Sequence, residues 1–215
     1  MFRTLLFIPG NNKRFVEKAR SLNADIICFD LEDSVPLNEK QNARDIVSEA
    51  LDKKEDYGNR NVYVRINSYE SGIAIQDLDA IVSDEIDGVV VPKVNDAKEV
   101  RHLVRKLIEL ERQKTMSKKM GMMASIESAQ GLINSYSIAT ADLRVKMLVF
   151  GVFDFLYDMG LDYVQDGIEY SFARAKIPID ARAAGIGAID AIWQKVDDVE
   201  GLVRDASTAK RLGYQ

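Results

Sequence analysis

Short apolar runs rich in β-branched residues alternate along the chain with longer stretches in which apolar residues recur every three or four positions. Such runs are typical of buried strands, and the longer stretches are typical of amphipathic helices. We predict strands in the ranges 4–10, 25–33, 61–67, 88–94, 120–128, 145–154 and, more weakly, 187–193. We predict helices in the ranges 13–23, 39–55, 75–85, 96–114, 129–143, 169–185 and 198–213.

Seven strand-then-helix pairs without a break in composition predict one α/β domain over residues 1–215. A buried parallel sheet forms either an open doubly wound sheet or a closed (β/α)₈ barrel. The first turn, "IPGNNKRF", lacks the G-x-G-x-x-G pattern of a dinucleotide-binding fold. We therefore expect a TIM barrel that is truncated before or at its eighth strand, or a sequence that lacks its end after "LGYQ".

Composition narrows the class of protein further. With 47% apolar and 29% charged residues the chain is an ordinary globular one, and a net charge of −5 gives no reason to expect nucleic-acid binding. The longest N-terminal apolar run, "LLFI", is too short for a signal peptide or a membrane span. The single cysteine, Cys28, lies in an apolar run and is consistent with the reducing cytoplasm.

Charged and polar residues follow the ends of the second to sixth predicted strands. They are Asp30, Glu32 and Asp33, then Arg65 and Asn67, then Lys93, Glu127 and Asp154. In a barrel, the carboxyl ends of the strands and the loops after them form the active site. Unlike charges that converge on a concave mouth indicate a functional site.

Each of these residues also has a purely structural interpretation. Glu32 or Asp33 would cap the helix that begins near Leu37, and Asp154 would be the N-cap of a helix after the sixth strand. Glu127 would be a first-turn acid that the helix dipole favours. Arg65 and Lys93 would pair with the acids. These interpretations explain the coincidence of charge at five consecutive strand ends poorly.

The chemistry that suits these groups is limited. The single histidine, His102, lies within a predicted helix, and no serine stands in a nucleophile elbow. Glu127 and Asp154 on separate strands, together with waters and a chelating substrate, suit Mg²⁺, which can polarise a carbonyl. The guanidinium of Arg65 offers a two-donor fork for a carboxylate. A metal-bound carbonyl beside an Arg-bound carboxylate describes a 2-keto acid.

Longer motifs carry a family resemblance. The opening segment 3–44, with "FIPGNNKRF" and "FDLEDSVP", resembles citrate lyase β-subunit-like proteins of the HpcH/HpaI aldolase superfamily. "VYVRIN", "VVVPKV", "SIESAQG", "VFGVFDFLYDMG" and "ARAAGIGAID" follow in the order of that family. The resemblance covers essentially the whole chain.

The resemblance implies a Mg²⁺-dependent lyase that cleaves citramalyl-, malyl- or citryl-CoA to acetyl-CoA and a 2-keto acid. It implies that Glu127 and Asp154 bind the metal and that Arg65 binds the substrate beside Glu127. Glu32 and Asp33 would support catalysis by holding the metal's waters and orienting Arg65. It also implies a homo-oligomer, commonly a homotrimer.

Three further residues follow from the same resemblance. Lys40 and Arg44 in "EKQNAR" correspond to a basic pair that we expect to partner the acids. In "GVFD", Phe153 stands before Asp154 where the family often has an acid, "GxED". The family usually continues with a "GK…IHP" segment, strand eight and a helical extension, which this sequence does not contain.

Other functions stay open at this point. The chain could be the β subunit of a citrate lyase complex, acting on an acyl-carrier-protein thioester. It could be a non-catalytic relative that binds Mg²⁺ and a keto acid or CoA. A class II pyruvate aldolase is disfavoured, because those enzymes usually place a histidine near the metal and His102 is badly placed for that.

Overall fold

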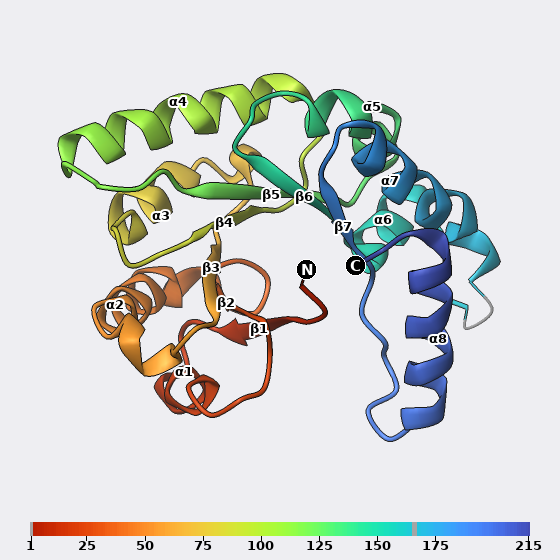
Figure 1. Ribbon diagram of the computed structural model, residues 1–215, viewed down its shortest axis with the longest axis horizontal. Helices are drawn as coiled ribbons and strands as arrows, with labels where there is room; N and C mark the ends of the chain where they lie inside the picture. Colours follow the sequence, from red (N-terminus) through yellow and green to blue (C-terminus); the bar gives the residue numbers. More distant parts are fainter. Residues whose placement is uncertain (1, 165–166) are drawn as a thin grey trace. The chain divides into compact units, whose positions relative to one another are not determined.

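The computed structural model describes residues 2–164 and 167–215 and confirms the α/β class (Figure 1). The strands are β1 (Leu5–Pro9), β2 (Ile26–Asp30), β3 (Asn61–Arg65), β4 (Gly88–Val91), β5 (Gly121–Ile126), β6 (Val145–Phe150) and β7 (Gly187–Ile189). The helices are α1 (Lys13–Ala19), α2 (Lys40–Leu51), α3 (Ala74–Ile81), α4 (Ala97–Gln113), α5 (Ala129–Ala139), α6 (Val152–Met159), α7 (Ser171–Ala183) and α8 (Val199–Leu212). Short 3₁₀ turns lie at Leu37–Glu39, Lys54–Tyr57, Tyr69–Ser71 and Ile168–Tyr170.

The strands form one sheet in chain order, β1-β2-β3-β4-β5-β6-β7, and a helix follows each strand. The pairs β1–β2, β2–β3, β3–β4 and β6–β7 are parallel. Sequential parallel strands with intervening helices are the topology of a TIM barrel. The described residues contain seven strands of that pattern, as predicted.

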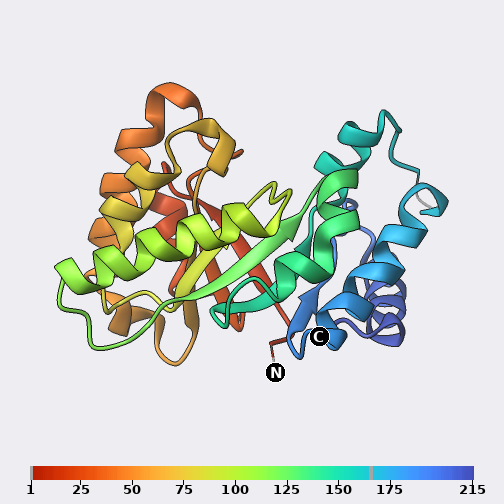
Figure 2. The same cartoon turned by 90° about the horizontal axis from the view of Figure 1, so that it is seen from above.

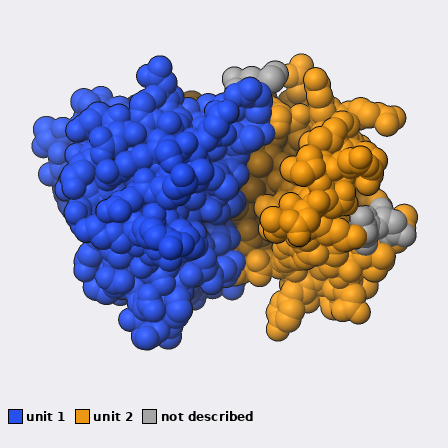
Figure 3. Space-filling model, turned by 90° about the horizontal axis from the view of Figure 1, so that it is seen from below, with its two compact units in different colours: residues 1–92, 101–122 blue, residues 93–100, 123–215 orange. Residues whose placement is uncertain are grey.

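The chain divides into two compact units (Figure 3). Unit 1 comprises Met1–Pro92 and Arg101–Met122, and unit 2 comprises Lys93–Val100 and Met123–Gln215. The single domain expected over 1–215 stays a prediction.

In unit 1, β2 and β4 are buried on both faces. Every residue of β2 and of β4 is buried, which explains why these runs are almost wholly apolar. Helices α1, α2 and α3 lie side by side along one face of β1–β4 (Figures 1 and 2). Gly88 opens β4, since a Cβ there would lie 2.4 Å from the carbonyl oxygen of Gly121 and 2.5 Å from the ring of Tyr63.

In unit 2, α5 and α7 pack on each other and on β6. The first turn of α8 is held by a capping hydrogen bond and by a close contact at Gly201. The side chain of Asp198 caps α8 by accepting a hydrogen bond from the Gly201 N–H at 2.8 Å. A Cβ on Gly201 would lie 2.3 Å from the indole of Trp193. Trp193 therefore packs directly on the first turn of α8.

One part of the sequence prediction was wrong. The range 145–154 was expected to be a single strand, but β6 ends at Phe150, and α6 begins at Val152 after an N-cap at Gly151. Val152, Phe155 and Leu156 are buried, which is the helical spacing of three and four. Because α6 follows β6 directly, its apolar residues continued the strand pattern in the sequence.

No helix among residues 2–164 and 167–215 combines the length and the apolar character needed to cross a membrane.

Candidate active site

Charged side chains form two clusters at the carboxyl ends of strands, one within each unit. The first, the Arg65 cluster, consists of Arg65 with Asp30, Glu32 and Asp33. Arg65 ends β3 and Asp30 ends β2, and the two are partners in the parallel register. Arg65 Nε donates to Asp30 Oδ1 and Nη2 donates to Oδ2, each at 2.7 Å. The pair is therefore a bidentate fork.

Two further acids contact the same guanidinium at longer range. Arg65 Nη1 lies 3.2 Å from Glu32 Oε2 and 3.4 Å from Asp33 Oδ2. The face of the guanidinium lies 4.9 Å from the ring centre of Phe7 on β1. Glu32 and Asp33 thus contact Arg65 as expected, and Asp30 is its principal partner.

Burial and charge both act on this pair. The side chain of Arg65 is 15% exposed and that of Asp30 is 1% exposed. Burial lowers the pKa of the Arg65 guanidinium, but the hydrogen bonds to Asp30 and the charges of Asp30, Glu32 and Asp33 outweigh it and raise that pKa. Burial raises the pKa of the Asp30 carboxyl, but the bonds and charge of Arg65 outweigh it and lower that pKa. Both groups are held in their charged forms.

The segment after β2 is held by hydrogen bonds between its main-chain groups and the side chains of Asp30 and Lys40. The carboxylate of Asp30 accepts hydrogen bonds from the N–H of Glu32 at 2.9 Å and of Ser34 at 3.1 Å. Lys40 Nζ donates to the carbonyl oxygens of Leu31 and Glu32, both at 2.7 Å. Burial lowers the pKa of the Lys40 ammonium despite the acids around it. Lys40 therefore positions the acidic segment through main-chain carbonyls.

A second buried network supports this segment from α3. Asp77 is fully buried and accepts hydrogen bonds from the Asn67 N–H at 2.6 Å and from Asn67 Nδ2 at 2.7 Å. Arg44 Nε donates to the other carboxylate oxygen of Asp77 at 2.8 Å. Asn67 Nδ2 also donates to the carbonyl of Leu31 at 2.9 Å. Asn67 thereby connects the loop after β3 to the loop after β2.

The Glu127 cluster, in unit 2, consists of Lys93, Glu127 and Asp154. Glu127 follows β5 and is 5% exposed. The N–H of Lys93 donates to Glu127 Oε2 at 3.1 Å, and Lys93 Nζ lies 3.6 Å from Asp154 Oδ1. Lys93 therefore contacts both carboxylates, one through its backbone and one through its ammonium group.

Gly151 provides the space for the Glu127 side chain. A Cβ on Gly151 would lie 2.4 Å from Cγ and 2.7 Å from Oε1 of Glu127. The N–H of Gly151 donates to the carbonyl of Ile126 at 3.1 Å, so the backbone that carries Asp154 is bonded beside Glu127. Any larger residue at 151 would displace the carboxylate.

The donors of the Glu127 cluster fit Mg²⁺. Mg²⁺ is usually bound by one or two carboxylates and keeps several waters. Glu127 and Asp154 supply two carboxylates, and both contact Lys93. The close approach of Gly151 to Glu127 is the feature that a fixed ligand carboxylate requires.

None of the four acids Glu32, Asp33, Glu127 and Asp154 caps the helix that follows it. The 3₁₀ turn at Leu37 has Pro36 as its N-cap, without a side-chain bond, so neither Glu32 nor Asp33 caps it. Asp154 lies in the first turn of α6, whose N-cap is Gly151. Glu127 precedes Ser128, which is the N-cap of α5. The capping interpretations were wrong, whereas the pairing of Arg65 and Lys93 with acids was confirmed.

One residue role differs from expectation. Arg44 pairs with Asp77 of α3 instead of with the strand-end acids. Asp77 had no distinguishing feature in the sequence, because it lies inside an ordinary amphipathic helix. His102 lies on the exposed face of α4, with its ring 5.1 Å from that of Tyr69, which confirms that it is a surface residue.

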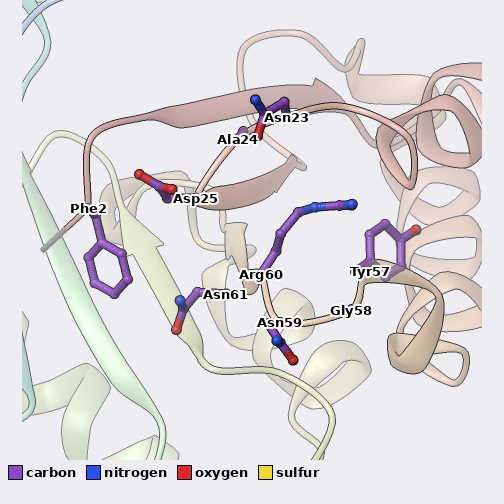
Figure 4. A pocket seen from close by; sticks show the side chains of 9 residues that line it. All are labelled: Phe2, Asn23, Ala24, Asp25, Tyr57, Gly58, Asn59, Arg60 and Asn61. Carbon is purple, nitrogen blue, oxygen red and sulfur yellow. The ribbon is translucent and has the colours of Figure 1, made fainter.

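A hollow of about 400 Å³ lies in unit 1, where β2 and β3 begin (Figure 4). Its charged side chains already have partners. Asp25 pairs with Arg3 at 2.9 Å, and Arg60 donates to the carbonyl of Arg20 at 2.7 Å. The amino ends of barrel strands contribute stability more often than catalysis. This hollow is not a candidate active site.

Residues 3–215 match the family model described as HpcH/HpaI aldolase/citrate lyase. The chain belongs to this family. The family predicted from the sequence motifs is therefore confirmed, and with it the enzyme class, a carbon–carbon lyase.

Two curated relatives and one solved structure illustrate the similarity. The chain is 39% identical to citrate lyase subunit beta of Leuconostoc mesenteroides, over 99% of this chain and 70% of that protein. It is 32% identical to (3S)-malyl-CoA thioesterase of Cereibacter sphaeroides, also over 99% and 70%. Protein CitE of Mycobacterium tuberculosis, solved with magnesium, acetoacetate and coenzyme A, is 27% identical, with a TM-score of 0.78 over 98% of this chain and 73% of that one.

Proposed function

We propose that the protein cleaves a 3-hydroxyacyl-CoA, such as citramalyl-, malyl- or citryl-CoA, to acetyl-CoA and a 2-keto acid with the help of Mg²⁺. The family membership and the malyl-CoA and coenzyme A named for two of the relatives support this class of substrate. The observation that carries the proposal is that the Glu127 and Asp154 carboxylates both meet Lys93, with Gly151 making room for Glu127.

Glu127 and Asp154 would hold the Mg²⁺ ion. When bound, the ion would act as a Lewis acid on the C3 oxygen of the substrate. This oxygen becomes the keto oxygen of the product. Glu127 is nearly buried, whereas the side chain of Asp154 is 38% exposed. The buried ligand would fix the position of the ion and the exposed ligand would face water and substrate.

Arg65 would bind the substrate carboxylate. Asp30 occupies Nε and Nη2, which fixes the plane of the guanidinium. The Nη1 edge, with its longer contacts to Glu32 and Asp33, is then the edge toward which a carboxylate would dock. Glu32 and Asp33 would orient this edge.

The proposed reaction is a retro-Claisen cleavage that needs no other reactant. The C3 hydroxyl loses its proton, the C2–C3 bond breaks, and C3 becomes the carbonyl carbon of the keto acid. The electron pair of the broken bond passes to C2 as a thioester enolate, which gains a proton to give the acetyl thioester. Preorganised donors that point at the developing negative charge lower the energy of such an enolate.

The test is acetyl-CoA release from citramalyl-, malyl- and citryl-CoA, each with Mg²⁺ and with EDTA. We expect turnover of one thioester with Mg²⁺ and none with EDTA. Free thiol is measured in parallel, because a thioesterase would release CoA instead of acetyl-CoA. Binding of pyruvate or oxaloacetate with Mg²⁺ but without turnover of any thioester would favour a non-catalytic binding protein.

A second candidate is the β subunit of a citrate lyase complex, which acts on a citryl thioester of an acyl-carrier protein. The 39% identity to a citrate lyase subunit beta favours it. The two candidates share a site and differ in the thiol carrier. Cleavage of citryl carrier-protein thioester without cleavage of citryl-CoA would support the second candidate over the first.

We also propose a cytoplasmic homo-oligomer, by family analogy a homotrimer. Unit 2 exposes many large apolar side chains on its helices, among them Tyr157, Phe172 and Ile179 at 88, 68 and 64% exposure. A second copy of the chain would cover such a surface. Sedimentation equilibrium is expected to show a self-associated species, and a stable monomer at micromolar concentration would contradict this.

A further inference from the structure

Lys93 is held in an unusual backbone conformation. Its φ is +52°, in the left-handed region that side chains other than glycine rarely adopt. Among the described non-glycine residues, only Thr115 shares a positive φ. Such conformations persist where the surrounding structure fixes them, and they are frequent at functional sites.

The loop around Lys93 is fixed by bonds within unit 2. The Val94 N–H donates to the carbonyl of Ser125 at 3.2 Å. Ser128 Oγ donates to Asn95 Oδ1 at 2.5 Å, and Asn134 Nδ2 donates to the carbonyl of Asn95 at 2.8 Å. These bonds attach the loop to β5 and α5 and keep Lys93 in its strained conformation.

The left-handed turn gives Lys93 two contacts with the carboxylates. Its N–H donates to Glu127 Oε2, and its ammonium group lies 3.6 Å from Asp154 Oδ1. The ammonium of Lys93 is a positive charge beside Asp154, one of the two carboxylates that would bind Mg²⁺. A cation in that place lowers the repulsion between the carboxylates, and it also repels an arriving divalent ion.

We propose that Lys93 is a built-in counter-ion of the Glu127–Asp154 pair, which keeps Mg²⁺ affinity low until an anionic substrate takes over its ammonium group. The inference rests on the metal site of the proposed function. A 2-keto acid is an anion, so the ammonium that repels the metal attracts the acid. Lys93 is thus a positioning residue that makes the binding of metal and acid interdependent.

The experiment is calorimetric titration of the full chain with MgCl₂, first alone and then with saturating pyruvate. For Lys93→Met we expect Mg²⁺ affinity without pyruvate to rise at least about tenfold, since the variant lacks the positive charge 3.6 Å from Asp154 Oδ1 that repels the divalent ion. We expect the gain in affinity that pyruvate gives the wild type to shrink in this variant.

Two variants serve as controls. Lys93→Arg keeps the charge and is expected to bind Mg²⁺ like the wild type. Lys98→Met makes the same substitution at an exposed lysine of α4 in unit 2 and is expected to leave Mg²⁺ affinity unchanged. Circular dichroism confirms that each variant is folded before titration.

The outcomes separate the two proposals. If Lys93→Met binds Mg²⁺ no more tightly than the wild type, or if the gain from pyruvate is unchanged, the counter-ion role is wrong. If the wild type, Lys93→Met and Lys93→Arg all fail to bind Mg²⁺, both in the presence and in the absence of pyruvate, the metal assignment of the proposed function is wrong instead.

Discussion

Arg65 and Asp30 face each other across two adjacent parallel strands and join through two hydrogen bonds of equal length, 2.7 Å. The bond pair fixes the guanidinium in one plane before any substrate arrives. Preorganised donors of this kind lose little entropy on binding a carboxylate.

Replacing Asp30 by Asn is expected to lower the free energy of unfolding by about 3 kcal/mol, because it leaves a buried guanidinium without its main counter-charge. The matched variant Asp33→Asn removes a carboxylate that is 48% exposed and 3.4 Å from Arg65. We expect it to cost less than about 0.5 kcal/mol. Urea denaturation measures both, and equal losses would show that Asp30 is not the principal partner.

The same pair predicts a dependence of stability on pH. The folded-state pKa of Asp30 lies below its ordinary value of 3.8. Its contribution to stability is therefore complete above about pH 4 and is lost as the pH falls through the folded-state pKa. The stability difference between the wild type and Asp30→Asn should shrink below about pH 4. A difference that is constant down to pH 3 or so would contradict this linkage.

Arg65→Lys keeps the charge but removes the planar fork. We expect the affinity for pyruvate or oxaloacetate in the presence of Mg²⁺ to fall at least about tenfold, because a lysine cannot hold Asp30 through two parallel donors and present a further fixed donor to the acid. Mg²⁺ binding without keto acid should stay unchanged, since the carboxylates assigned to the metal are Glu127 and Asp154. Weaker Mg²⁺ binding without keto acid would mean that Arg65 acts on the metal and not on the acid.

Gly151→Ala tests the space beside Glu127. The new methyl group would lie 2.4 Å from Glu127 Cγ, so the carboxylate must move. We expect Mg²⁺ affinity to fall at least about tenfold, because a metal ligand must keep its position within about half an ångström. Unchanged affinity in this variant, measured by calorimetry on folded protein, would remove Glu127 from the metal site.

Gly88→Ala is expected to destabilise unit 1 by about 3 kcal/mol or more, or to prevent folding, because the methyl group would collide with the carbonyl oxygen of Gly121. The control is Gly72→Ala, also in unit 1, where no atom lies within 4 Å but the backbone is left-handed with φ +75°. Only the left-handed backbone is then penalised, by about 1 kcal/mol. Thermal denaturation compares the two, and a Gly88→Ala loss no larger than that of Gly72→Ala would contradict the crowding.

The strands and most helices could be predicted from hydrophobic periodicity, because buried parallel strands such as Ile26–Asp30 are continuous apolar runs. The acids and bases at strand ends were visible because charge interrupts those runs abruptly. The beginning of α6 was missed, since its buried Val152, Phe155 and Leu156 prolong the apolar run of β6 without a helix-capping side chain.

Partner choice could not be predicted in the same way. Asp30, Glu32 and Asp33 are three similar acids within four positions, and only the register between β2 and β3 brings Asp30 opposite Arg65. Asp77 lies far from Arg44 in the sequence, and no local pattern announces their pairing. Lys93 has an ordinary place in "VVVPKV", and its left-handed turn results from bonds that Val94 and Asn95 make with β5 and α5.

The packing of Trp193 on Gly201 gives unit 2 an optical label of its own, since the chain has one tryptophan. Its fluorescence reports the docking of α8, whereas far-ultraviolet circular dichroism averages the helices of both units. Coincident unfolding curves from the two signals would mean that the chain melts as one cooperative domain. A fluorescence transition that precedes the loss of helix would mean that α8 undocks from Trp193 before the rest of the chain unfolds.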